Sequence, residues 1–231
     1  MGVGRRMRDT GGRHELKHYI NHVDLLQLRA RLPCVMSVDE NAEADGGYRV
    51  RSLYFDNYND KVLREKIDGV DDREKFRLRF YNNDVSFIRL EKKSKKGGVC
   101  FKRSAHISDH VCSELLEGNY DALKETGDPL HMEFYTKLRH ELLRPQNIVD
   151  YRREAFVFLA GQVRGTLDYD IRSGFYAADF LKPRYISLPI PEVIILEVKY
   201  DHFLPELIRG VTSLSSRRST AFSKYAATRI I

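Results

Sequence analysis

The chain has 231 residues, of which 42% are hydrophobic, with 12 Phe and 13 Tyr, and it carries a formal net charge of +6. This length and apolar content suffice for one domain with a full core, so a largely disordered chain is excluded. The excess of cations favours anionic partners: phosphate compounds, nucleic acid or an anionic membrane face.

The three cysteines are Cys34, Cys100 and Cys112, an odd number without CxxC spacing. This pattern argues against a disulfide framework or a zinc site and favours free thiols in a reducing cytoplasm. No apolar run approaches the roughly 18 residues that a membrane span needs. We therefore expect a cytoplasmic protein; a peripheral location at the membrane, with a membrane-protein partner, stays open.

The first 12 residues are basic, with Arg5, Arg6 and Arg8, and they lack the apolar stretch of a signal peptide. We interpret residues 1–12 as a mobile basic tail that precedes a single domain over residues 13–231.

The N-terminal part of that domain predicts a strand, a helix and a second strand. A strand is expected over residues 13–20, and Asn21 is suited to cap a helix that ends at Pro33. Residues 48–56 predict a long strand, and residues 57–68 predict a loop with a short helical turn. The apolar side of the helix is expected to contain Val23, Leu25, Leu26, Leu28 and Leu32.

Hairpin strands and then helices follow. Strands are predicted over residues 73–81, 85–93 and 99–107, the first two joined by a turn at Asn82–Asp84. Short and longer helices are predicted over residues 109–117 and 131–143. The longer helix has apolar residues at helical spacing, which we expect to lie in the core, and Pro145 should stop it. These apolar residues are Met132, Tyr135, Leu138, Leu142 and Leu143.

Strands return in the last third, over residues 148–159, 162–170 and 192–200, before two short helices at 205–210 and 219–229. Strands, a helical insert, more strands and a helical tail predict the α+β class, organised around an antiparallel β-barrel.

The most informative segment places four cations at alternate positions, Arg73, Lys75, Arg77 and Arg79. Side chains alternate between the faces of a strand, so all four share one face. Like charges this close repel one another, which is tolerable in water or against a polyanion. A solvated sheet face is the plainer interpretation of this row.

Other predicted strands also offer a charge to one face. These charges are Glu15 and Lys17, Arg89 with Glu91 and Lys93, Lys102, Arg153, Arg164 with Asp168, and Glu197 with Lys199. A closed barrel would bring these faces together as a charged lumen. Its arginines would clamp a triphosphate-like anion, and its carboxylates would hold a divalent metal.

Eight short motifs, in this order, resemble the polyphosphate polymerase domain of the vacuolar transporter chaperone proteins. That domain belongs to the triphosphate tunnel metalloenzymes, which include CYTH-type proteins. The motifs span nearly the whole chain: Arg13-x-Glu15-x-Lys17, Ser52-Leu-Tyr-Phe-Asp56, Arg73-x-Lys75-x-Arg77-x-Arg79, Leu90-Glu91-Lys-Lys93, Tyr151-x-Arg153-x-Ala-Phe156, Arg164-x-Thr166-x-Asp168, Leu196-Glu197-Val-Lys199-Tyr200 and Phe222-Ser223-Lys224-Tyr225.

The resemblance implies an eight-stranded antiparallel tunnel in which ATP donates its γ-phosphate to a growing polyphosphate chain. It also implies Mn²⁺ or Mg²⁺ as cofactor. The eukaryotic proteins carry a phosphate-sensing module and transmembrane helices that this chain lacks, so we expect a stand-alone member of bacterial type.

Site residues follow from the matching motif positions. The resemblance implies Glu197 as the main metal carboxylate, with Glu15 and Glu91 in support. The remaining cations of the alternating strands, Arg73, Lys75, Arg89, Lys102 and Arg164, are expected to bind phosphate. The catalytic phosphate ligands that the resemblance implies are Lys17, Arg77, Arg79, Lys93, Arg153, Lys199 and Lys224.

Two other functions stay open. A triphosphatase would use the same tunnel with water as acceptor, and a non-catalytic module would only bind polyphosphate. Nucleic acid is disfavoured, because base stacking requires exposed aromatic rings beside the cations, whereas Phe76 and Phe80 alternate away from them. Glu91 with Lys93 and Glu197 with Lys199 could also be plain cross-strand ion pairs.

Overall fold

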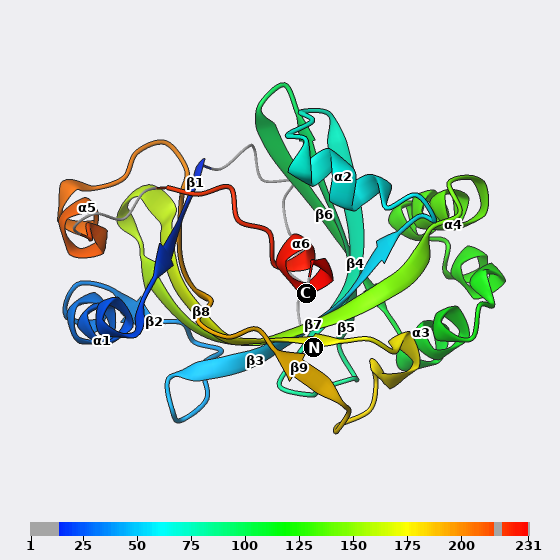
Figure 1. Cartoon of the computed structure of the whole chain (residues 1–231), viewed down its shortest axis with the longest axis horizontal. Helices are drawn as coiled ribbons and strands as arrows, with labels where there is room; N and C mark the ends of the chain where they lie inside the picture. The colour runs from blue at the N-terminus through cyan, green and yellow to red at the C-terminus, as the bar shows by residue number, and fades with distance from the viewer. Residues whose placement is uncertain (1–13, 215–218, 231) are drawn as a thin grey trace, which may run out of the picture.

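In the part of the chain that the structure describes, ten antiparallel strands form one continuous, strongly curled sheet (Figure 1). The computed structural model describes residues 14–214 and 219–230, so the predicted basic tail at 1–12 and Arg13 lie outside the described residues. Eight strands follow the order β1-β10-β8-β7-β3-β4-β5-β6, while β2 pairs with β7 and β9 pairs with β8. The α+β class and the eight-stranded antiparallel core that the sequence predicts are confirmed.

The strands are β1 (His14–Ile20), β2 (Ser37–Val38), β3 (Gly47–Asp56), β4 (Arg73–Tyr81), β5 (Ile88–Lys96), β6 (Val99–Ile107), β7 (Arg144–Phe158), β8 (Val163–Gly174), β9 (Ser187–Pro189) and β10 (Ile194–Tyr200). The helices are α1 (His22–Arg31), α2 (Lys61–Ile67), α3 (Asp109–Leu116), α4 (Pro129–His140), α5 (Glu206–Thr212) and α6 (Lys224–Arg229). In this described part, no helix combines the length and the apolar character that a membrane crossing requires.

The two faces of β4 differ as the alternation predicts. Phe76, Leu78 and Phe80 are at most 2% exposed and pack in a core with α3 and α4. The cations of β4 lie on the opposite, concave face, because side chains alternate along a strand. The curl of the sheet therefore gathers the charged faces of β1, β4, β7, β8 and β10 around one interior.

The two ends of the sheet, β1 and β6, have no backbone ladder between them in the described part of the chain. A side-chain contact brings the ends together instead: Lys93 of β5 donates to Glu15 of β1 at 3.0 Å. The curled sheet is thus a barrel with an open seam.

Helix α6 lies within the curve of the sheet (Figure 1). Its Tyr225 hydroxyl donates to the Asp56 carboxylate at 2.7 Å, and Asn147 donates to Thr228 at 2.6 Å. Just before the helix, the Thr220 amide donates to the Lys17 carbonyl at 2.8 Å. These bonds fasten the C-terminal segment over the concave face, where it helps to enclose the interior.

The register of helix α4 differs from the prediction. It begins at Pro129, which Asp128 caps, and ends at His140. Its buried stripe includes Leu130, Phe134 and Leu138 at a spacing of four, whereas Met132 and Leu142 are 40% and 53% exposed. Their placement in the core was wrong, because a second apolar stripe on the same segment suggested a different helix phase.

Further boundaries also differ. Residues 219–223 are not helical as predicted: Ser219 forms a β-bridge with His18, residues 220–223 have no regular secondary structure, and Ser223 caps α6. The predicted strand 85–93 lies three residues later, because the turn region after β4 extends to residue 87. In α1, Val23 and Leu26 are exposed rather than buried.

Candidate active site

Two adjoining cavities occupy the concave face of the sheet. The main chamber has a volume of about 690 Å³, and the outer compartment has a volume of about 200 Å³. Among the described residues, eleven Lys or Arg but three Asp or Glu line the main chamber. Lys17, Lys75 and Lys93 line both cavities, which makes them the boundary between the two.

The first wall of the main chamber is a pair of fixed guanidiniums on β4. Arg77 donates to Glu91 at 2.8 Å and to the Tyr54 hydroxyl at 2.9 Å. Arg79 donates to Ser52 at 2.8 Å and to the Tyr151 hydroxyl at 3.2 Å. Because both groups are held in place before any ligand arrives, they form a preorganised anion clamp.

Glu91 lies behind this wall and is 2% exposed. Its carboxylate lies 2.6 Å from Arg77 and 2.6 Å from Lys102, and 3.9 Å from Arg79. Burial alone would raise the pKa of Glu91, but these three cations outweigh it and hold the pKa well below its ordinary range. This environment favours a role in positioning cations, and the predicted metal role of Glu91 remains a prediction.

The opposite wall is a buried triad on β7, β8 and α6. Arg153 donates twice to Asp168, at 2.6 and 2.7 Å, and Lys224 donates to the same carboxylate at 2.5 Å. Burial would raise the pKa of Asp168, yet Arg153 and Lys224 lower it to about 2. Asp168 therefore stays ionised and anchors two cations that line the chamber.

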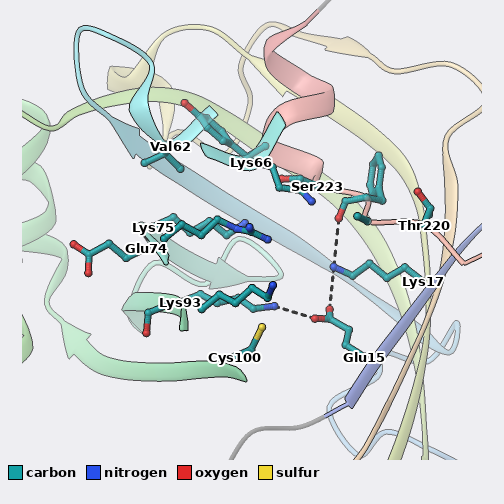
Figure 2. Close-up of a pocket in the computed structure, with 16 residues that line it drawn as sticks. Glu15, Lys17, Val62, Lys66, Glu74, Lys75, Lys93, Cys100, Thr220 and Ser223 are labelled. Carbon is teal, nitrogen blue, oxygen red and sulfur yellow. Dashed lines mark hydrogen bonds and ion pairs between the residues drawn. The ribbon is translucent and has the colours of Figure 1, made fainter. Parts of the chain in front are cut away.

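Between the walls, two carboxylates share three lysines. Glu15 pairs with Lys17 at 2.9 Å and with Lys93 at 3.0 Å, as Figure 2 shows. Glu197 pairs with Lys199 at 2.6 Å and with Lys17 at 3.5 Å. Burial and the charge of Glu197 raise the pKa of Glu15, but Lys17, Lys199 and Lys93 outweigh them and lower it. Burial also raises the pKa of Glu197, but the neighbouring cations, Lys199 first, hold it well below its ordinary range, so both carboxylates stay ionised.

This pair is the donor set that fits a divalent metal. Mg²⁺ typically takes one or two carboxylates together with phosphate oxygens rather than a full protein cage. Among the described residues no group of three or more His, Cys, Asp or Glu could hold a metal ion. Glu15 and Glu197, which both contact Lys17, are the carboxylates of the chamber that could hold such a metal together with phosphate oxygens of a substrate.

The structure brings most of the predicted residues together. All seven predicted catalytic cations line the main chamber, as do Lys75, Lys102 and Arg164. Arg73 lines the outer compartment. Arg89 lines neither cavity; its guanidinium lies over the Phe87 ring at 4.7 Å.

Several site residues were missed from the sequence. Tyr54 and Tyr151 line the chamber, and their hydroxyls accept hydrogen bonds from Arg77 and Arg79, respectively. Ser52 of β3 accepts a second hydrogen bond from Arg79. Burial would raise the pKa of Tyr54, but the surrounding cations, Arg77 first, lower it to about 7. The sequence contains a pattern that could have identified Ser52 and Tyr54. They lie at alternate positions of one motif, and cross-strand pairing places them opposite Arg79 and Arg77.

The family model described as the VTC domain matches residues 12–230. Among solved structures, one similar protein is HpAC1 from Hippeastrum, which is described as an adenylyl cyclase candidate with a dominant triphosphatase activity. It is 13% identical to this chain, the match covers 94% of this chain and 95% of that one, and the TM-score is 0.57. An adenylate cyclase candidate from Bacillus halodurans is 13% identical over 80% of this chain and 78% of its own, with a TM-score of 0.47. No curated protein matches the chain.

Proposed function

Because this chain belongs to the VTC domain family, we propose that it transfers the γ-phosphoryl group of ATP to the end of a polyphosphate chain. One observation carries the proposal: a chamber on the concave face of the sheet whose described lining has eleven cations and three acids. Phosphoryl transfer depends mainly on positioning and on neutralising charge at the phosphates, and such a chamber supplies both.

Each charged residue of the chamber has a proposed role in this reaction. Arg77 and Arg79 on one wall and Arg153 on the other would grip the triphosphate of ATP from both sides. Lys17 and Lys199, beside the two carboxylates, would neutralise the transferred group. A divalent metal held by Glu15 and Glu197 would supply further charge neutralisation at the phosphate oxygens.

The reaction balances without a protein nucleophile. A terminal oxygen of the acceptor chain forms a bond to the γ-phosphorus of ATP. The bond from that phosphorus to the bridging oxygen breaks, and its electron pair leaves with ADP. One ATP and a chain of n phosphates thus give ADP and a chain of n+1 phosphates.

A triphosphatase is the second candidate. Water would replace the acceptor chain, and the same clamps would hold the triphosphate. The Hippeastrum protein, which shares the fold, is described with that activity.

Product analysis tests the proposal. The purified protein is incubated with ATP and Mn²⁺ or Mg²⁺, the products are resolved by gel for chain length, and free phosphate is assayed. Polyphosphate ladders with ADP are the expected result. Free phosphate without polymer would assign the triphosphatase function instead, and tight polyphosphate binding without either product would leave a binding module.

A further inference from the structure

The outer compartment contains cations that the chamber chemistry does not use. It lies where α2, the start of β4, the end of β5 and the segment 220–225 meet, and Figure 2 shows its side chains converging. Lys66 reaches it from α2, a segment whose sequence predicts only a loop and a short turn. Arg73 and Lys95 line it from β4 and β5.

The charges there are only partly compensated. Glu15 pairs with Lys17 and Lys93, and Asp71 pairs with Lys95 at 2.5 Å. Among the described residues, neither Lys66 nor Lys75 forms an ion pair with a carboxylate, although both line this compartment. Unpaired ammoniums that face one another in a half-buried hollow are unfavourable unless an anion joins them.

The cations also act on one another. Burial lowers the pKa of Lys66, and Arg73, Lys17, Lys93 and Lys95 lower it further. These neighbours come from β1, β4 and β5, so Lys66 faces positive charge from three strands. An anion with several linked charges would relieve this repulsion more effectively than a single ion.

The compartment is small for a nucleotide. Its volume of about 200 Å³ lies below the roughly 300–1,000 Å³ of typical sites for drug-sized ligands. The apolar side chains that line it, Val62, Phe222 and Tyr225, are buried and offer no exposed ring for a base. A thin chain of repeating phosphates fits both the space and the charge.

We propose that the outer compartment is the binding site for the polyphosphate acceptor chain, and that Lys66 of α2 is one of its ligands. This proposal rests on the proposed function. The chain end would lie at the boundary lysines Lys17, Lys75 and Lys93, facing the ATP in the main chamber. The rest of the chain would pass Arg73, Lys66 and Lys95 on its way out.

Binding measurements on single-residue variants test the site. Affinities for a long polyphosphate and for tripolyphosphate are measured by calorimetry on wild type, Lys66→Glu and Lys66→Met. Tripolyphosphate is short enough for the main chamber to hold alone. We expect Lys66→Glu to weaken long-chain binding by about tenfold or more, Lys66→Met to weaken it less, and both to leave tripolyphosphate binding unchanged.

Arg64→Glu is the matched control, because Arg64 is exposed on the same helix and lines neither cavity. It should leave both affinities unchanged. Unchanged long-chain affinity in both Lys66 variants would overturn the proposal, and so would an equal loss of tripolyphosphate affinity. These binding measurements do not depend on turnover. If the wild-type protein made no polymer but the Lys66 variants still lost affinity for long polyphosphate alone, the binding site would be supported and only the polymerase function would be rejected.

Discussion

Arg153 and Asp168 lie directly opposite each other on β7 and β8, joined by two hydrogen bonds of 2.6 and 2.7 Å. Asp168 is completely buried, and its Oδ2 also accepts a hydrogen bond from Lys224 of α6 at 2.5 Å. One carboxylate therefore orients two chamber cations and ties the C-terminal helix to the sheet.

Asp168→Asn should destabilise the protein strongly. Removing one partner of a buried ion pair leaves an uncompensated charge, which typically costs about 3–5 kcal/mol. The free energy of unfolding in urea measures this loss. Asp170→Asn is the control on the same strand, because Asp170 is 40% exposed and its pairs with Arg49 and Arg172 should be worth about 1 kcal/mol or less. Equal unfolding free energies for the two variants would contradict the assigned role of Asp168.

Glu197→Gln should abolish turnover while polyanion binding stays largely intact. The substitution keeps the size of the side chain but removes a charge that a divalent metal requires, so we expect a fall of about 100-fold or more in the turnover rate. Turnover with ATP and Mn²⁺, and tripolyphosphate binding, are the paired measurements. Glu206→Gln on the exposed surface of α5 is the control. A fully active Glu197→Gln variant would exclude Glu197 as a metal ligand.

Polyanion affinity should fall as the pH rises through about 7. Burial lowers the pKa of Lys75 to about 7, and Lys93, Arg77 and Lys17 contribute in the same direction, while Tyr54 opposes them. Above that pH Lys75 loses its charge, and Tyr54, whose pKa is also about 7, gains a negative one. Both changes weaken polyanion binding.

The dissociation constant of tripolyphosphate between pH 6 and 9 measures this effect. Lys75→Met and Tyr54→Phe should each flatten part of the pH dependence, since each removes one titrating group. A wild-type affinity that does not change across this range would show that neither group titrates there.

We also expect the protonated form of Lys75 to destabilise the folded protein when no polyanion is bound. Its folded-state pKa of about 7 lies below its ordinary value of 10.5, so the unfolded chain binds the proton more tightly. This destabilisation is complete below pH 7 and disappears as the pH rises towards 10.5. Lys75→Met should therefore raise the free energy of unfolding at pH 7, and a decrease would show that charged Lys75 stabilises the ligand-free protein.

The charged lumen was predictable because it follows from alternation along strands. Arg77 and Phe76 had to lie on opposite faces of β4 once that segment was a strand, and Phe76 is indeed buried. The gathering of Glu15 with Glu197 also follows from two acid-x-base motifs on paired strands.

Other features depend on contacts between distant segments. Glu91 lies among Arg77, Arg79 and Lys102 because β4, β5 and β6 pair in one particular register, which no local pattern specifies. Lys66 reaches the outer compartment only because α2 lies beside β4. The exposure of Met132 likewise depends on which of the two apolar stripes of α4 packs in the core.

End-labelling measures the proposed transfer most directly. ATP labelled on its γ-phosphate is mixed with an unlabelled polyphosphate of defined length and the purified protein, in the presence of Mn²⁺. The label should appear on chains lengthened by single phosphates, with one ADP formed for each phosphate added. Label found only in free phosphate, with the acceptor chain unchanged, would contradict the polymerase function and identify water as the acceptor.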